Sequence, residues 1–229
     1  MKALKQRLSL IASMVIGGRS VCDVGTDHGY LPAFLFLEGI SQNITATDIR
    51  EKPLENAREN LERLGADKVK LLLCDGLAGV SRESGDNVII AGMGGEVISG
   101  IIQRTPWLKD GSVNLILQPM TAARELRLFL ASSGFEVIRE EAVADGRKIY
   151  SVMQVRFCGQ SKEIGCVQEH IGLLKPDSAE AISYIQKQLY ICEKALAQMG
   201  ALAEKNEEYK QKWVLSEKLR EILEKENGS

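Results

Sequence analysis

The chain has 229 residues, of which 45% are hydrophobic and 26% charged, a composition typical of ordinary folded proteins. Its 29 basic and 31 acidic residues give a net charge of -2, so no general positive field attracts nucleic acid, and any such contact must come from a local patch. Five scattered cysteines and only two histidines argue against a disulfide framework or a metal site, and they favour reduced thiols in the cytoplasm.

The first segment predicts an amphipathic helix rather than a secretory leader. Its apolar residues fall at helical spacing on one face: Leu4, Leu8, Ile11, Ala12 and Val15. Arg7 interrupts the apolar run, and the glycines at 17–18 supply a C-terminal stop. No other segment approaches the length of a membrane span, so we expect no membrane partner.

Short apolar runs and helical patterns then alternate along the chain. The predicted strands are 20–24, 43–48, 69–74, 87–91 and 113–117. The predicted helices between them are 31–38, 53–64 and 97–102. Strict alternation of this kind predicts a parallel sheet with helices on both faces.

Two further extended runs, 135–142 and 148–157, are joined through Asp145-Gly146, a dipeptide that favours a tight hairpin turn. Two closing strands in antiparallel pairing are uncommon in dinucleotide-binding folds. They are typical of the class I (Rossmann-like) methyltransferase sheet, which has seven strands. We therefore predict an α/β fold of that class with an antiparallel terminal hairpin.

The composition changes again from Gly159. Residues 160–176 look like a connector with one short helix, after which Asp177 or Ser178 caps a long helix that runs to Met199. Gly200 marks a turn, and a second helix is expected at about 204–226. We divide the chain into a cofactor-binding domain, 1–159, and a C-terminal helical hairpin, 160–229.

The turn after the first strand carries the strongest functional signal. Gly25 opens a G-x-G-x-x-G frame, but Asp27 occupies the second glycine position and Tyr30 the third. In a dinucleotide site the second glycine lets the backbone approach the pyrophosphate, which a carboxylate would repel. The turn suits an adenosine ligand that carries positive charge in place of phosphate, and S-adenosylmethionine fits that description.

Acidic residues also end the second and third strands. Asp48 is placed to accept hydrogen bonds from both ribose hydroxyls, although an acid at a strand end is often only a helix cap. Asp75 is placed to accept the adenine amino hydrogen, with Gly76 leaving room for the ring. An Asp-Gly pair is also a common turn signal, so both interpretations of 75–76 stay open.

The segment Gly92-Met93-Gly94-Gly95 follows the fourth strand, where methyltransferases present the target atom. Its glycines allow close approach of a flat base, and many amino-methylating enzymes instead place an acidic or Asn residue and two prolines here. We assign His28 a binding role rather than proton transfer, and we expect His170 to be ordinary surface. Arg7 either binds the cofactor carboxylate or an RNA phosphate, or is a solvated charge on the helix surface.

With these residues assembled, the chain resembles the bacterial tRNA (adenine(22)-N1)-methyltransferase family. The segments that carry the resemblance are 23–32 (DVGTDHGYLP), 47–48 (TD), 74–77 (CDGL), 91–95 (AGMGG) and 117–119 (LQP). The helical tail also resembles the coiled-coil-like C-terminal domain of that family.

The resemblance implies which residues bind the cofactor and which face the target base. By resemblance the cofactor residues are Asp23, Gly25, Asp27, His28, Asp48, Asp75 and Gly76, and we add Arg7 and Gly92 to them. Met93 and Gly94 are the target-facing residues, in a positioning role without an assigned general base.

We therefore predict transfer of a methyl group from S-adenosylmethionine to N1 of a tRNA adenine, which must be flipped out of any pairing because N1 lies on the Watson–Crick edge. Tail lysines at 187, 194, 212 and 218 would contact tRNA phosphates. The alternatives are methylation of another RNA or a small molecule, and a non-catalytic S-adenosylmethionine-binding module. An NAD oxidoreductase comes last, and the sequence sets no oligomeric state.

Overall fold

Seven strands form a single mixed sheet in the order β3-β2-β1-β4-β5-β7-β6 in the computed structural model, which describes residues 4–199 and 206–227. The strands are β1 Val21–Val24, β2 Ile44–Asp48, β3 Lys70–Leu73, β4 Asn87–Gly94, β5 Asn114–Thr121, β6 Phe135–Asp145 and β7 Lys148–Phe157. The first five pair in parallel, while β7 pairs antiparallel with both β5 and β6. The predicted fold class is confirmed.

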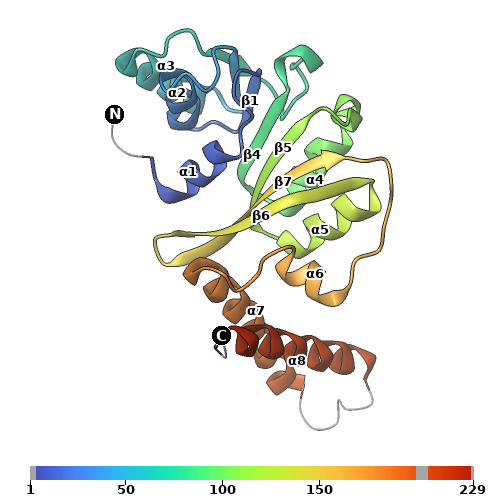
Figure 1. The fold of residues 1–229 in the computed structure, drawn as a ribbon. Helices are drawn as coiled ribbons and strands as arrows, with labels where there is room; N and C mark the ends of the chain where they lie inside the picture. Colours follow the sequence, from blue (N-terminus) through green and yellow to red (C-terminus); the bar gives the residue numbers. More distant parts are fainter. Residues whose placement is uncertain (1–3, 200–205, 228–229) are drawn as a thin grey trace.

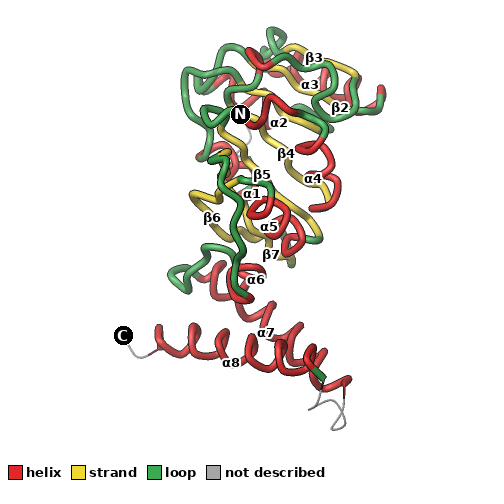
Figure 2. Tube along the Cα trace, turned by 90° about the vertical axis from the view of Figure 1, so that its right-hand side faces the viewer, coloured by secondary structure: helices red, strands yellow, loops and turns green. Residues whose placement is uncertain are grey.

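Helices cover both faces of this sheet (Figures 1 and 2). The helices are α1 Gln6–Ser13, α2 Tyr30–Leu37, α3 Glu51–Leu64, α4 Gly95–Gln103, α5 Ala123–Ser132, α6 Cys166–Ile171, α7 Ala179–Met199 and α8 Glu207–Asn227, with short 3-10 turns η1 Arg82–Ser84 and η2 Pro106–Lys109. One apolar cluster joins the sheet to α1, α2 and α3, and a second joins its other face to α4 and α5. Successive side chains of β4 point to opposite faces of the sheet, so Val88 and Ile90 belong to one cluster and Ile89 to the other.

The N-terminal helix is confirmed but shorter than predicted. It ends at Ser13, before the glycines at 17–18, because Met14 and Val15 turn back with hydrogen bonds to Ile11 and Ala12. Ile11 and Ala12 are buried in the cluster beside α2, so the predicted apolar face does pack on the sheet.

Several boundaries differ from the sequence predictions. β4 runs three residues past Ala91 to Gly94, and β5 runs past Leu117 to Thr121, so Gly92, Met93 and Gly94 continue the strand, while Gly95 is the first residue of α4. The register shifts around Met93, which pairs with Pro119, and such an irregularity tolerates a proline that lacks the ladder donor. β6 likewise extends to Asp145, and no helix was predicted over the segment that forms α5.

We call α7 and α8 together the helical arm; it lies beneath the β6–β7 hairpin, at the opposite end of the molecule from α2 and α3 (Figure 1). Its apolar core includes Ile185, Cys192 and Leu219, and it also contacts Ala142 and Ile149 of the hairpin. Ser178, rather than Asp177, caps α7: its hydroxyl oxygen accepts a hydrogen bond from Ala181 N at 3.1 Å.

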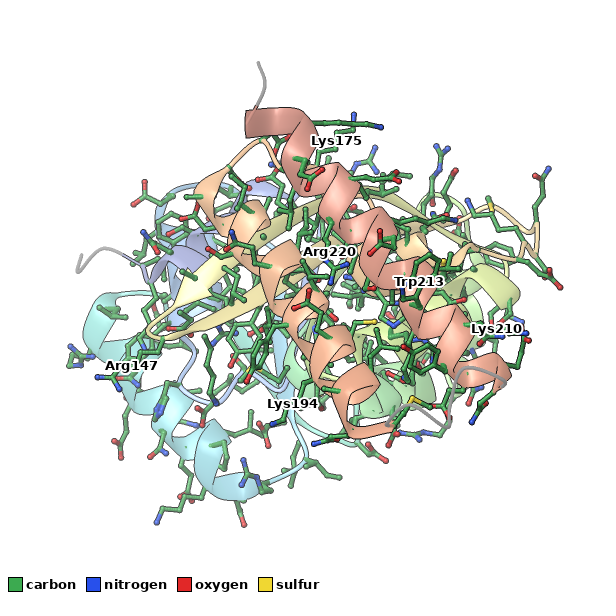
Figure 3. The ribbon with its side chains drawn as sticks, turned by 90° about the horizontal axis from the view of Figure 1, so that it is seen from below. Arg147, Lys175, Lys194, Lys210, Trp213 and Arg220 are labelled. Carbon is green, nitrogen blue, oxygen red and sulfur yellow. The ribbon has the colours of Figure 1, made fainter. Side chains whose placement is uncertain are left out.

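The predicted turn and second helix of the arm are only partly covered by the described residues. Gly200 and the expected start of the second helix at Glu204 lie outside the described residues, and the described helix begins at Glu207. The apolar side chains of the arm are not all buried: Ile182 is only partly buried, and Trp213 is 51% exposed. Figure 3 shows Trp213 on α8.

Candidate functional site

The carboxyl ends of β1, β2 and β3 bring the predicted cofactor residues to one edge of the sheet. Backbone hydrogen bonds join these ends: Gly25 N donates to Thr47 O at 2.8 Å, and Cys74 N donates to Asp48 O at 3.0 Å. The Thr47 hydroxyl also donates to Gly76 O at 3.0 Å. We call this edge, with Asp23, Asp27, Asp48 and Asp75, the acidic edge.

The turn after β1 has a backbone that few residue types adopt. Gly25 has φ +75°, and a side chain there would overlap the methyl group of Met93. Asp27 is left-handed at φ 52°, a region in which Asp is tolerated better than most residues. Gly29, also left-handed, then starts α2, and a Cβ there would lie 3.2 Å from Ala57 Cβ. The glycines therefore serve close packing on both sides of the turn.

Asp23, to which the family resemblance gave a cofactor role, lies buried at the base of this turn. Burial raises the pKa of Asp23 to about 6, and the nearby charge of Asp48 acts in the same direction, while the Thr26 side chain lowers it in part. No basic side chain pairs with Asp23 among the described residues. Its negative charge is therefore poorly compensated by the protein itself.

Asp48 is buried at the end of β2, and it is not the cap of α3, whose N-cap residue is Arg50. One carboxylate oxygen accepts a hydrogen bond from Arg50 N at 2.9 Å. The Arg50 guanidinium approaches that same oxygen only to 3.9 Å and is mostly exposed. The second oxygen has no hydrogen bond from the described chain, so it is available to a ligand hydroxyl.

Asp27, His28 and Asp75 lie at the exposed rim. The His28 ring nitrogen is 3.4 Å from the Asp27 carboxylate, and both side chains are more than half exposed. Asp75 is 59% exposed and 3.5 Å from Arg104. Gly76 is left-handed at φ +59°, and a Cβ there would lie 3.0 Å from Ile101, so this position does require glycine.

The glycine segment brings Met93 across to the β1 turn. Gly92 has φ +78°, Gly94 is the N-cap residue of α4, and Gly95 packs so closely on the Ala122 carbonyl that a side chain there would overlap it. The Met93 methyl group lies over Gly25, so this side chain spans the distance between the predicted cofactor turn and the predicted target segment. Gly94 lies beside Thr121, whose hydroxyl would be 3.2 Å from a Cβ.

Arg7 is not a solvated charge. Its Nε donates to Asp145 at 3.0 Å, and its Nη1 donates to Gln118 Oε1 at 2.8 Å. The same oxygen accepts a hydrogen bond from Gly92 N at 3.2 Å. Arg7 thus reaches the glycine segment from α1, and its side chain is 19% exposed.

Gln118 and Asp145 are the residues of this region that sequence reasoning missed as site residues. Gln118 is fully buried, and its amide nitrogen donates to Pro119 O at 2.9 Å. A glutamine at the end of an apolar strand was the available signal, since a buried amide needs partners for both of its polar atoms. Asp145 was assigned only a turn role.

The acidic edge fits a cationic adenosine ligand. Thr26 Oγ1 is a buried side-chain oxygen without a hydrogen bond of normal geometry, so the turn retains unused hydrogen-bonding capacity. Two buried carboxylates, Asp23 and Asp48, lack close basic partners within the described part of the chain. A diphosphate would meet repulsion here, whereas a sulfonium and an ammonium group would be attracted.

A separate cleft of about 780 Å³ lies between α5, α6 and the arm, away from the acidic edge. Some of its charges are paired: Arg124 contacts Glu169 at 2.6 Å, and Lys212 contacts Glu208 at 3.5 Å. His170 in its wall is half-buried, contrary to the expectation of ordinary surface, and burial lowers its pKa.

Within residues 4–199 and 206–227, no group of three or more His, Cys, Asp or Glu side chains is arranged to hold a metal ion. No helix of this described part combines the length and apolar character needed to cross a membrane.

Comparison with known proteins adds to this geometry. Residues 4–153 match the family described as "Methyltransferase domain". The chain is 30% identical over 151 residues to the tRNA (adenine(22)-N(1))-methyltransferase of Bacillus subtilis, a match that covers 66% of this chain and 63% of that protein. In sequence, the matched part thus spans less than two thirds of that relative.

A solved structure is similar over nearly the whole chain. It is that of a Streptococcus pneumoniae protein described as a candidate tRNA (m1A22) methyltransferase, with a TM-score of 0.83 and 30% identity over 96% of this chain and 100% of that one. The same protein has been solved in complex with S-adenosyl-L-methionine, with a TM-score of 0.81 and 29% identity over the same shares of both chains.

Proposed function

Because this chain belongs to the tRNA (adenine(22)-N1)-methyltransferase family, we propose that it transfers a methyl group from S-adenosylmethionine to N1 of adenine 22 in tRNA. The observation that supports this most strongly is the pair of buried carboxylates, Asp23 and Asp48, beside the Gly25 turn. The Met93 side chain reaches that turn from the glycine segment, so donor and target residues adjoin one another.

The proposed donor site extends along the acidic edge. The free oxygen of Asp48 accepts hydrogen bonds from the ribose hydroxyls. Asp75 and Gly76 hold the adenine at the end of β3. Gly25, Asp27 and His28 line the turn next to the charged end of the ligand, and Asp23 attracts its positive charge from below. Arg7, beside Gly92, binds the carboxylate of the ligand.

The methyl donor supplies an electrophilic carbon that needs no further activation, so the task of the chain is alignment. Gly92 and Gly94 let the target base approach the backbone closely, and Met93 packs beside the base. Carbonyl oxygens of the glycine segment stabilise the positive charge that develops on the methylated ring. Adenine N1 carries a lone pair, so no residue is given the role of a general base.

The proposed partner is a folded tRNA that contacts the arm. Lys194 and Lys218 are exposed and have no ion pair in the described chain, so they are the best phosphate ligands of the four lysines suggested by the sequence. Lys212 pairs with Glu208, and Lys187 donates to Ile149 O at 3.4 Å. Figure 3 shows Lys194 on α7 and Lys210 on α8 at the face seen from below.

Two further points belong to the same proposal. Residues 1–159 act as the cofactor-binding domain, and residues 160–229 act as the helical domain that meets tRNA. The enzyme works in the cytoplasm, which suits five cysteines that are all unpaired.

The test is methylation of tRNA transcripts by the purified protein with labelled S-adenosylmethionine, followed by nucleoside mass analysis. We expect 1-methyladenosine in a transcript with adenine at position 22 and none in the same transcript with guanine there. Tight donor binding without label in any tRNA would contradict the function and favour a non-catalytic module. Labelling at another position or in a small molecule would favour the other alternative.

A further inference from the structure

A buried ion pair lies outside the acidic edge, where α5 meets β6. Arg127 Nη2 donates to Glu140 Oε1 at 2.6 Å, and its Nε donates to the same oxygen at 3.2 Å. The two side chains are only 2% and 0% exposed. Burying such a pair contributes little stability compared with apolar packing, so its presence calls for another explanation.

The remaining donors of Arg127 reach strand β7 and the segments that carry the arm, and Nη2 donates to the hydroxyl of Ser151 on β7 at 3.2 Å. Nη1 donates to the carbonyl oxygens of Glu169 and His170 in α6, both at 3.0 Å. Nη2 also donates to the hydroxyl of Tyr184 on α7 at 3.1 Å. One guanidinium therefore joins α5 to β6, to the connector and to the arm.

Glu140 completes the junction from the other side. Its second oxygen accepts the backbone N–H of Leu173 at 3.0 Å. The chain reaches it through Gly172, which has φ +61° and no room for a Cβ beside the Glu140 carboxylate. Arg127 and Glu140 thus hold the connector between sheet and arm through hydrogen bonds to its backbone.

The same strand also reaches the proposed site. Five residues after Glu140, β6 ends at Asp145, which holds Arg7 at 3.0 Å. Arg7 in turn contacts Gln118, whose oxygen accepts Gly92 N. β6 is therefore tied to the arm at Glu140 and to the glycine segment at Asp145.

We propose that Arg127 and Glu140 are a positioning pair that fixes the helical arm relative to the glycine segment, so that a tRNA held on the arm presents its target adenine to the donor. This rests on the proposed function. A fixed arm makes presentation of the adenine an intramolecular step, whereas a loose arm lowers its effective concentration at the site.

The first test compares Arg127→Met/Glu140→Leu with the wild type. Replacing both partners leaves no unpaired buried charge, so this variant is expected to fold. We expect kcat/KM for tRNA to fall at least tenfold, mainly through KM, while the Kd for S-adenosylmethionine changes less than twofold. Tyr184→Phe, which removes only the contact to α7, should show a smaller change in the same direction.

The matched control is Leu61→Ala, which destabilises α3 on the far side of the sheet without touching the arm. An equal rise in the tRNA KM for this control, or a parallel loss of donor affinity in the double variant, would show a merely structural role and overturn the proposal.

A second measurement needs no substrate. Hydrogen exchange should accelerate in α6, at the Leu173 amide and in the first turns of α7 of the double variant, while β1 to β4 stay as protected as in the wild type. Unchanged exchange in these segments would overturn the positioning role even if the wild type methylates tRNA. Loss of protection in the double variant, together with a wild type that methylates no tRNA, would contradict the proposed function alone.

Discussion

The acidic edge and the Arg127–Glu140 junction both concentrate charge, but they neutralise it in different ways. At the junction one cation and one anion satisfy each other and the surrounding backbone. At the acidic edge, among the residues that the structure describes, Asp23 has no basic partner and Asp48 meets only a distant guanidinium at 3.9 Å. Fully paired buried charge fixes structure, whereas unpaired buried charge is typical of a site that binds something of opposite charge. We therefore expect mutations at the junction to lower the free energy of unfolding, and mutations at the acidic edge to weaken the binding of S-adenosylmethionine.

The largest expected effect is at the junction. Arg127→Met leaves the Glu140 carboxylate buried without its partner, which should lower the free energy of unfolding by about 3–5 kcal/mol. Urea denaturation of the single variant and of Arg127→Met/Glu140→Leu measures this directly. The double variant should recover most of the loss, and failure to recover would mean that the charges are not the cause.

Gly172→Ala should act at the same junction by a steric route. The added Cβ overlaps the Glu140 carboxylate and occupies a backbone conformation at φ +61° that alanine rarely adopts, so a loss of about 3 kcal/mol is expected. Gly17→Ala is the control, because its Cβ makes only an ordinary contact of 3.7 Å with Ile40 O. Thermal melts of the two variants that coincide would contradict this account of Gly172.

At the acidic edge, Asp48→Ala should weaken S-adenosylmethionine binding about 10- to 100-fold, since hydrogen bonds to a charged acceptor contribute about 1.5–3 kcal/mol. Asp67→Ala removes one exposed carboxylate elsewhere and keeps the same net charge as the test variant. Calorimetric titration separates the two: similar losses of affinity would indicate a general charge effect rather than contact with ribose.

Asp23 should make donor binding pH-dependent. With its pKa raised to about 6 by burial, the carboxylate loses its charge as the pH falls, and donor affinity should drop about tenfold at pH 5. Folding responds in the opposite sense: a raised pKa contributes stability that is fully present below the ordinary value near 4 and is lost as the pH rises through about 6. Asp23→Asn should flatten both profiles, as measured by titrations and melts from pH 4.5 to pH 8.

Met93→Leu should have the smallest effect. Leucine keeps the volume that fills the space over Gly25 but lacks the flexible thioether, so a change of only a few fold in kcat is expected, with donor affinity unchanged. Steady-state kinetics would refute the assigned position of Met93 if the donor Kd, rather than kcat, were the parameter that moved.

The sequence predicted the parts of this molecule that depend on local patterns. The β1 turn, the acids at the ends of β2 and β3, and the antiparallel hairpin follow from residues that are neighbours in the chain. The helix Ala123–Ser132 was not predicted, and β5 continues to Thr121, past the Pro119 that marked its expected end.

Contacts between distant residues could not be inferred in this way. Arg7 meets Gln118 across 111 residues, and Arg127 meets Tyr184 across 57, so each pairing exists only after the sheet has brought its elements together. The raised pKa of Asp23 has the same origin, because burial by neighbouring elements, rather than the local sequence, causes it.

The most direct test of the central claim is a pair of calorimetric titrations of the purified protein, one with S-adenosylmethionine and one with NADH. An edge with two poorly compensated buried carboxylates should bind the cationic methyl donor, bind it about 10- to 100-fold more weakly in Asp48→Ala, and give no heat with the anionic dinucleotide. Binding of NADH without binding of S-adenosylmethionine would contradict the account.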